Sequence, residues 1–296
     1  MQEEPDYGTL KKGGFMRQVQ KDRFSLRLRV TGGRFGSAQL RKVSEVAERF
    51  GQGYVHFTCR QGVEIPFIAL EDIAAVKAAL AEAGVSPGSC GPRVRTVTAC
   101  QGSEVCPGGL INTSALAAEM DARYFGAELP HKFKIGVTGC PNNCLKAEEN
   151  DLGVKGAVFP AWKAGECVFC GLCEGVCPAR AILVDKTAET LSYAAERCAF
   201  CGKCVKSCPA SAWEGKKGYL LFFGGSFGNE IKPGAPLFPP FFEKPRLFKA
   251  ADAAVAFYRE QGKPGERFGK TIARVGRAVF AAAMNEKMGK AGETDG

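Results

Sequence analysis

Alternating apolar and polar residues predict a strand near the start of the chain. Between Phe24 and Val30 the apolar side chains share one face, and Arg27 and Arg29 share the other. The segments that follow predict, in order, a helix over residues 40–50, strands over 54–58 and 63–68, and a helix over 73–80. This strand–helix–strand–strand–helix order predicts a ferredoxin-like α/β half-domain within residues 1–90.

The pattern changes twice further along the chain. Residues 91–160 contain a predicted strand over 94–98, a helix over 113–125 and a strand in LPHKFKIGVTGC, which carries Lys132 and Lys134 at alternate positions. From 161 to 213 helical periodicity disappears and cysteines crowd together. In residues 214–296, GYLLFFGG predicts a buried strand, and a helical tail follows. We therefore predict an α+β chain whose second α/β domain, residues 91–160 and 214–296, is interrupted by an insertion at 161–213.

Composition restricts the classes of protein that fit. The hydrophobic content of 45% and charged content of 24% are those of a globular protein. No apolar run reaches the roughly 18 residues of a membrane span, and the first residues lack the apolar region of a signal peptide, so we expect a cytoplasmic protein. The formal charge of +9 raises nucleic acid as a partner, but the basic residues are dispersed, and we predict no nucleic-acid binding.

Twelve of the fourteen cysteines form tight clusters, which favours metal ligation over a disulfide scaffold. CVFCGLCEGVCP and CAFCGKCVKSCP both follow the C-x2-C-x2-C-x3-C-P spacing of two-cluster bacterial ferredoxins. In that pattern the fourth cysteine of each run binds the other cluster. The predicted ligand sets are therefore Cys167, Cys170, Cys173 and Cys208 for one 4Fe-4S cluster, and Cys177, Cys198, Cys201 and Cys204 for the other. A pair of zinc knuckles is the alternative.

Four further cysteines lie outside the insertion. They form a C-x5-C pair, Cys100 and Cys106, and a C-x3-C pair, Cys140 and Cys144. Together the pairs supply the thiolates for a third cluster, with structural zinc as the alternative. The remaining two, Cys59 and Cys90, are predicted to be buried structural thiols.

Basic residues recur beside the predicted strands that precede these cysteines. Arg27 and Arg29 share one strand face, Lys132 and Lys134 share another, and Arg60 follows a third strand. A polar face exposed to water would explain any one strand. The recurrence on three strands favours an anion site, since arginine suits oxyanions and lysine adds a charge and a proton.

Five segments in this order resemble the sirohaem-containing sulfite and nitrite reductases: RLRVTGG, TCRQ, ACQGSEVC, LPHKFK and GCPNNC. With its inserted two-cluster ferredoxin, the chain is most similar to the catalytic subunit of anaerobic, NADH-linked sulfite reductases. The resemblance implies that Cys144 bridges a 4Fe-4S cluster to the sirohaem iron. It assigns Arg29, Arg60, Lys132 and Lys134 to the substrate pocket, and Arg27, Arg95 and Asn142 to the macrocycle. TCRQ departs from the family by its cysteine, and the full-length assimilatory enzymes contain this module twice.

The resulting hypothesis is six-electron reduction of sulfite to sulfide, with sirohaem and three 4Fe-4S clusters. Nitrite reduction to ammonia, and an electron-transfer subunit without turnover, are the alternatives. The clusters contribute about −2 each and sirohaem about −8, which turns +9 into about −5. We expect a flavoprotein or ferredoxin as electron donor, and a homodimer or a larger complex.

Lys134 and Cys140 are six residues apart, about 20 Å in an extended strand. In the duplicated relatives, one copy of the module supplies the lysines and the other supplies the cysteines. Unless Gly136 and Gly139 allow a sharp bend, we expect Lys132 and Lys134 of one chain to serve the sirohaem held by a second chain.

Overall fold

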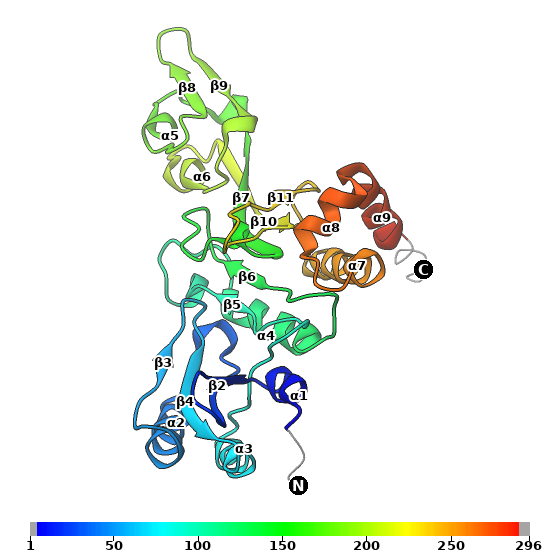
Figure 1. Ribbon diagram of the computed structural model, residues 1–296. Helices are drawn as coiled ribbons and strands as arrows, with labels where there is room; N and C mark the ends of the chain where they lie inside the picture. Colours follow the sequence, from blue (N-terminus) through cyan, green and yellow to red (C-terminus); the bar gives the residue numbers. More distant parts are fainter. Residues whose placement is uncertain (1–4, 290–296) are drawn as a thin grey trace, which may run out of the picture.

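The N-terminal part of the chain forms a four-stranded antiparallel sheet covered by helices. A computed structural model describes residues 5–289 (Figure 1). The strand order is β1-β2-β4-β3. The elements are α1 (Tyr7–Lys12), β1 (Phe15–Arg17), β2 (Arg23–Arg27), α2 (Ser37–Phe50), β3 (His56–Phe57), β4 (Val63–Ala69) and α3 (Ile73–Ala81). The predicted strand–helix–strand–strand–helix order is confirmed, and α1 and β1 precede it.

Alternation of apolar residues explains how this sheet is built. Phe24, Leu26 and Leu28 are at most 1% exposed and face the core, which α2 completes with Val43 and Val46. Burial of each such side chain contributes about 1.5–3 kcal/mol. The neighbouring arginines are excluded from the core and remain free to reach the second half of the molecule.

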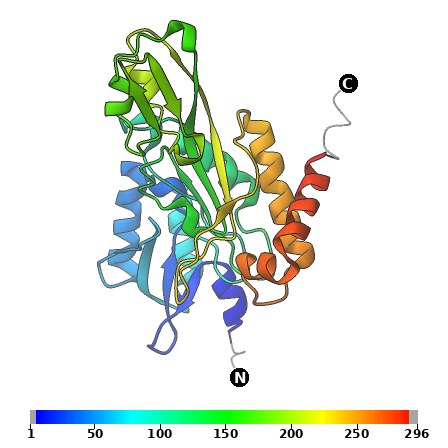
Figure 2. The ribbon, with the colours of Figure 1, turned by 90° about the horizontal axis from the view of Figure 1, so that it is seen from above.

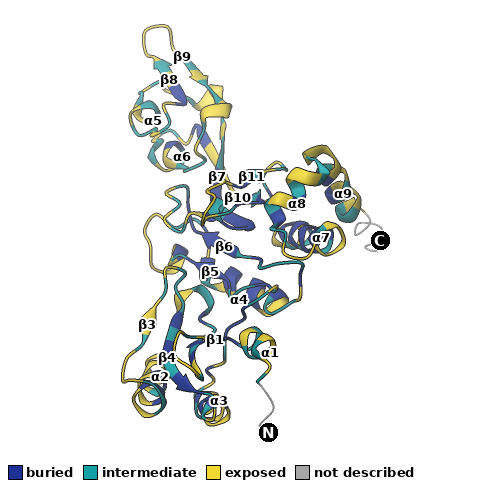
Figure 3. Cartoon of the chain, viewed as in Figure 1, coloured by how far each residue is buried: buried dark blue, intermediate teal, exposed yellow. Residues whose placement is uncertain are grey.

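A mixed five-stranded sheet, ordered β11-β10-β7-β6-β5, forms the centre of the molecule. Strands β5, β6 and β7 are parallel, and β7 pairs antiparallel with β10. The elements are β5 (Thr98–Ala99), α4 (Thr113–Tyr124), β6 (Ile135–Thr138), β7 (Leu152–Trp162), β10 (Trp213–Phe223), β11 (Ala235–Pro236), α7 (Lys244–Gln261), α8 (Phe268–Val275) and α9 (Arg277–Gly289). All residues of β6 are buried, and α4 and α7–α9 share one core with the sheet (Figure 3).

Two strand boundaries differ from the sequence prediction. The strand predicted over 94–98 is reduced to β5, with Val94 in an isolated bridge to Phe133. The strand predicted in LPHKFKIGVTGC begins only at Ile135, so Lys132 and Lys134 precede it. Within residues 5–289, the structure contains no helix long and apolar enough to cross a membrane.

A long β-ribbon carries the cysteine-rich segment away from this sheet. β7 and β10 pair without interruption from Leu152↔Phe223 to Trp162↔Trp213. Residues 161–213, here called the insert, form a small lobe at the far end of the ribbon (Figures 1 and 2). The lobe contains α5 (Leu172–Gly175), β8 (Ile182–Asp185), β9 (Thr190–Tyr193) and α6 (Lys203–Ser207). Its apolar centre consists largely of cysteines and aromatic rings.

Polar contacts join the two halves of the molecule. The side-chain amide of Gln61 donates to the Ala99 carbonyl (2.8 Å) and accepts from the Ala99 amide (3.0 Å). It thus makes the pair of hydrogen bonds that the backbone of a neighbouring strand would make. Arg29 pairs with the buried Asp121 at 2.7 Å, and Asp121 also accepts from Thr31. The turn that contains Arg60 is thereby fixed against β5.

Candidate functional site

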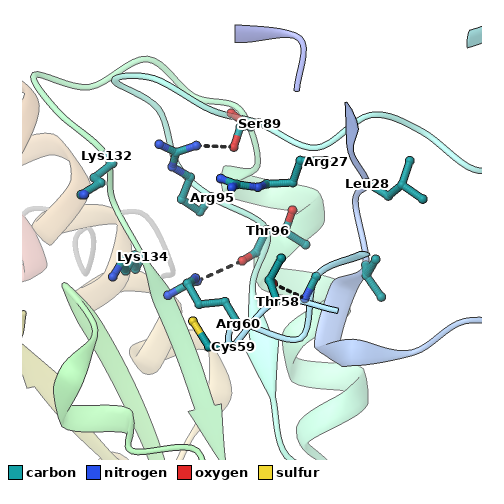
Figure 4. Close-up of a pocket in the computed structure, with 12 residues that line it drawn as sticks. Arg27, Leu28, Thr58, Cys59, Arg60, Ser89, Arg95, Thr96, Lys132 and Lys134 are labelled. Carbon is teal, nitrogen blue, oxygen red and sulfur yellow. Dashed lines mark hydrogen bonds between the residues drawn. The ribbon is translucent and has the colours of Figure 1, made fainter. Parts of the chain in front are cut away.

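A cationic cavity of about 230 Å³ lies where the two halves meet. Arg27 comes from the end of β2, Arg60 from the turn after β3, Arg95 from the segment before β5, and Lys132 and Lys134 from the segment before β6. Figure 4 shows these side chains around one space. Five of the predicted site residues are therefore brought together from segments more than a hundred residues apart.

Hydrogen bonds orient the arginines of this cationic cavity. Arg60 donates to Asn150 Oδ1 (3.1 Å) and to the Thr96 carbonyl (3.4 Å), and burial lowers its pKa to about 10. Arg95 donates to the Ser89 carbonyl at 2.6 Å. Arg27 forms an ion pair with Glu64 at 2.6 Å. The guanidinium groups are held by neutral acceptors and one carboxylate, so the cavity keeps a net positive charge.

Lys134 is the most strongly perturbed lysine of the cavity. Burial, followed by the charges of Arg60 and Arg267, lowers its pKa to about 8. Its backbone amide donates to Asp151 (2.8 Å), a fully buried carboxylate that also pairs with Arg267 at 2.9 Å. Burial likewise lowers the pKa of Lys132. A lysine in this state can release a proton near neutral pH.

Sequence reasoning missed Asp151 and Arg267. Asp151 stands just before β7 and Arg267 just before α8, and neither belongs to a recognisable motif. Their contact is visible only after the helical tail packs back against the sheet.

Two observations indicate that the cavity suits a polar ligand. Ser89 Oγ is buried, lines the cavity and has no hydrogen-bond partner among residues 5–289. A second cavity of about 530 Å³ shares Lys132 with the first and adds three cations, Lys232, Arg267 and Lys270. A large anionic group can therefore contact basic side chains over both spaces.

The structure does not bring every predicted site residue to the cationic cavity. Arg29 is not among the lining residues; it pairs with Asp121 and lies 4.0 Å from the centre of the Phe125 ring. Cys59, predicted to be buried, is exposed and lines the cavity, so that prediction is wrong. Cys90 is buried as predicted. An exposed position just before Arg60 could not be distinguished from a buried one by pattern alone.

The four cysteines of the central sheet gather at its opposite edge. Cys100 follows β5 and Cys140 follows β6, and carboxyl ends of parallel strands meet at one edge. Cys100 Sγ accepts from the Gly139 amide at 3.0 Å. A Cβ placed on Gly108 would lie 3.8 Å from Cys106 Sγ, 3.9 Å from Cys140 Sγ and 3.8 Å from Asn142 Nδ2.

Cys144 belongs to the same group. Burial raises the pKa of Cys140, and the thiols of Cys106, Cys100 and Cys144 lie near enough to raise it further. Asn142 accompanies these thiols and is absent from the lining of the cationic cavity.

β6 therefore separates the cations from these cysteines. Lys134 stands immediately before the strand and Cys140 two residues after it. The strand pairs with β7 in uninterrupted register, so the chain does not bend there. At about 3.3 Å per residue, a fully extended chain would place the two positions about 20 Å apart at most, and Gly139 and Cys140 form a bend after the strand.

The insert contains two cavities lined by cysteines. One cavity lies at the far end of the β7–β10 ribbon and is here called the distal cavity. It is lined by Cys167, Cys170, Cys173, Cys208 and Trp213 among others. The other cavity lies nearer the central sheet and is here called the proximal cavity, because its Cys201 forms a bridge with Val158 of β7. It is lined by Cys177, Cys198, Cys201, Cys204 and Tyr193 among others. These are the two groupings that the cysteine spacing predicts. In the part of the chain that the structure describes, no three His, Cys, Asp or Glu side chains converge on one ion position.

Two family models match the chain. "Nitrite/Sulfite reductase ferredoxin-like half domain" covers residues 16–83, and "Nitrite and sulphite reductase 4Fe-4S domain" covers residues 90–291. The chain therefore belongs to the nitrite and sulphite reductase family, as the resemblance of its motifs predicts.

The names of curated relatives include both sulfite reductases and nitrite reductases. The chain is 32% identical to the coenzyme F420-dependent sulfite reductase of Methanocaldococcus jannaschii over 287 residues, 96% of this chain and 46% of that protein. It is 30% identical to a subunit of the anaerobic sulfite reductase of Salmonella typhimurium over 169 residues, 52% and 50% of the two chains. A ferredoxin–nitrite reductase of Leptolyngbya laminosa is 32% identical over 167 residues, 53% and 32%. The chain thus matches about half or less of each of these relatives.

Two solved structures share the fold. Dissimilatory sulfite reductase I superposes with a TM-score of 0.71 at 19% identity, covering 89% of this chain and 69% of that one. The NirA protein of Mycobacterium tuberculosis gives 0.67 at 17% identity, covering 95% and 46%. At these identities the likeness establishes the mixed α/β fold.

Proposed function

We propose that this chain catalyses the sirohaem-dependent, six-electron reduction of sulfite to sulfide in the cytoplasm. The observation that carries the proposal is the convergence of five cationic side chains on one cavity in a protein with three separate cysteine groups. A binding module would have no need of a half-buried lysine with a pKa near 8 beside buried arginines. The two sulfite reductases among the relatives favour sulfite as the substrate.

The residues present fit sirohaem. Its eight carboxylates need many cations, and the two adjoining cavities offer eight: Arg27, Arg60, Arg95, Lys132, Lys134, Lys232, Arg267 and Lys270. The unpartnered Ser89 Oγ offers a further polar contact. When bound, the sirohaem iron and its coupled cluster supply the electrons and the metal site for the sulfur atom. Cys100, Cys106, Cys140 and Cys144 would hold that cluster, with Cys144 as the bridge and Asn142 beside the macrocycle.

The protein side chains have three tasks in this proposal. Arg60 and Lys132 hold the sulfite oxyanion in place by charge-assisted hydrogen bonds. Lys134 donates protons as S–O bonds break, and solvent returns them. Arg27 and Arg95 neutralise cofactor carboxylates. Arg29, which is engaged with Asp121, stabilises the junction of the two halves and is left out of the substrate site.

The order of the cysteine groups along the β7–β10 ribbon supports an electron relay. Gly139, beside Cys140, packs on Gly156; a Cβ at Gly156 would meet the Gly139 oxygen at 2.5 Å. Two residues further, Val158 forms a bridge with Cys201 of the proximal cavity. The distal cavity lies at Trp213, where the ribbon ends. We propose 4Fe-4S clusters in both cavities, with electrons entering at the distal one from a flavoprotein or ferredoxin.

The relay has a direct test. Cys170→Ser should slow turnover with the protein donor strongly but spare turnover with a small viologen reductant that reaches the central site. Equal loss with both reductants, with the other clusters intact, would contradict entry at the distal cavity.

We also propose that the active unit is a homodimer in which the cations of one chain face the cysteines of the other. Its support is the separation of Lys134 and Cys140 by the unbent strand β6. Mixed dimers of Lys134→Ala and Cys144→Ser should regain one intact site and measurable turnover. Demonstrated heterodimers without activity would show that each site is built within one chain.

The principal test is an optical spectrum combined with iron, acid-labile sulfide and sirohaem analysis, followed by kcat/KM for sulfite and nitrite. We expect a tetrapyrrole band, about thirteen iron atoms per chain (three 4Fe-4S clusters and the sirohaem iron) and a higher kcat/KM for sulfite. A higher value for nitrite would favour nitrite reduction, which the nitrite reductase relatives keep as the second candidate. Iron without any tetrapyrrole after reconstitution would indicate an electron-transfer subunit.

A further inference from the structure

The distal cavity contains a hydrogen-bond donor that the protein does not use. Trp213 is 3% exposed and lines this cavity together with its four cysteines. Its indole Nε1 is buried and has no partner among residues 5–289. Leaving such a donor unsatisfied destabilises the protein, so a buried unpartnered donor on a side chain that lines a cavity indicates a ligand that accepts its hydrogen bond.

The indole N–H lies beside the cysteine ligands. Burial raises the pKa of the Cys173 thiol, and the Trp213 indole is near enough to lower it. The two groups are nevertheless outside hydrogen-bonding geometry, so Cys173 alone does not satisfy the donor. A hydrogen-bond acceptor bound inside the cavity would satisfy the indole donor.

The proximal cavity differs in this respect. Tyr193 lines it, and its hydroxyl is not among the buried polar atoms that lack a partner in residues 5–289. The Tyr193 and Trp213 rings meet edge to face, with centroids 5.3 Å apart. The two aromatic side chains thus stand between the cavities, and of the two only the indole is a buried donor without a partner in residues 5–289.

We propose that the Trp213 indole N–H donates a hydrogen bond to a sulfur atom of the iron–sulfur cluster in the distal cavity and raises the reduction potential of that cluster. This inference rests on the proposed function, which places a cluster there. A reduced cluster carries one more negative charge than an oxidised one, so a donor to its sulfur stabilises the reduced form more. The cluster that receives electrons from the donor protein is thereby made easier to reduce than it would be without the indole donor.

The test is a potentiometric titration of the full-length protein, monitored by electron paramagnetic resonance, in Trp213→Phe and Trp162→Phe. Phenylalanine keeps an aromatic ring and removes only the N–H donor and the second ring. We expect Trp213→Phe to lower the potential of one cluster so that its reduced-to-oxidised ratio at fixed potential falls about tenfold, which is about 59 mV for one electron. The other clusters should keep their potentials.

Trp162 is a matched control. It pairs with Trp213 across the ribbon, and its Nε1 is also buried and unpartnered within the described chain, but it does not line the distal or the proximal cavity. Trp162→Phe should leave every potential unchanged. Unchanged potentials in both variants with full iron content, or equal shifts in both, would overturn the inference.

A second measurement covers the case in which Trp213→Phe loses its cluster. The chain has only two tryptophans, so 15N-indole labelling marks Trp162 and Trp213 alone. Hyperfine coupling of one indole nitrogen to a reduced cluster should be present in the wild type and in Trp162→Phe. Its absence from a protein with loaded clusters overturns the inference, whereas a wild-type insert without iron overturns the proposed relay itself.

Discussion

The insert and the cationic cavity gather their functional side chains in different ways. Each cavity of the insert takes its four cysteines from one short stretch, residues 167–208, and surrounds them with the aromatic rings of the same lobe. The cationic cavity takes Arg27, Arg60, Arg95, Lys132 and Lys134 from four segments and from both halves of the molecule. A local site is specified by spacing along the chain, whereas a composite site is specified by packing between elements.

The central cysteines combine features of both. The two cysteines of each pair are close in sequence. The pairs meet, however, at a sheet edge that β5 and β6 form and against which β7 packs. If composite sites depend on remote packing, small changes in distant elements should disable them and leave the insert intact.

The largest effect is expected from Gly156→Ala in β7. Because the new Cβ would lie 2.5 Å from the Gly139 carbonyl oxygen, the loop that carries Cys140 must move. We expect loss of the central cluster, a fall from about thirteen to about nine iron atoms per chain, and loss of sulfite turnover. Gly165→Ala in the insert, where no atom lies within 4 Å, should keep full iron content. Unchanged iron content in Gly156→Ala would show that the central cysteine site does not depend on the packing of β7.

The next effect concerns the cavity cations. Lys134→Met and Arg60→Met should each lower kcat/KM for sulfite by about 10²–10⁴, because proton transfer and oxyanion stabilisation are lost. Cluster content should stay at the wild-type value. Lys21→Met, a change at an exposed lysine, is the control and should have no effect. A wild-type kcat/KM in both cavity variants would show that the cationic cavity takes no part in catalysis.

A smaller effect should separate Arg29 from the other cations. Arg29→Gln removes the ion pair to Asp121, which is buried but keeps its bonds to Thr31 and the Val97 amide. We expect a loss of about 1–3 kcal/mol in the free energy of unfolding with KM for sulfite unchanged. Arg34→Gln, which breaks the more exposed pair to Glu104, should cost less than about 1 kcal/mol. A large rise in KM for Arg29→Gln would restore Arg29 to the substrate site.

The same distinction explains what the sequence could predict. Period-two alternation located β2, and helical spacing located α2 and α3, because each has one buried face. The repeated cysteine spacing gave the two groupings of the insert. By contrast, the direction of Arg29 and the exposure of Cys59 depend on how the two halves meet. The contact of Asp151 with Arg267 depends on the return of the tail, and no local pattern encodes it.

The smallest predicted effect is a pH dependence of anion binding to the cofactor-free chain. The pKa of Lys134 is lowered to about 8, chiefly by burial and then by the charges of Arg60 and Arg267. The protonated lysine attracts an anion and the neutral one does not, so affinity for sulfite should be highest below pH 8. As pH rises through about 8 and beyond, the affinity should fall by up to about tenfold per unit, the limit for one proton.

Calorimetric titration of wild type and Lys134→Arg checks this, since the arginine stays charged over the whole range. Sulfite itself titrates, but equally in both proteins, so the difference between the two curves reports the lysine. Adding the anionic cofactor should shift the fall to higher pH, because its carboxylates stabilise the protonated amine. Parallel curves for the two proteins would show that Lys134 does not face the bound anion, and the composite site would then lack its proposed proton donor.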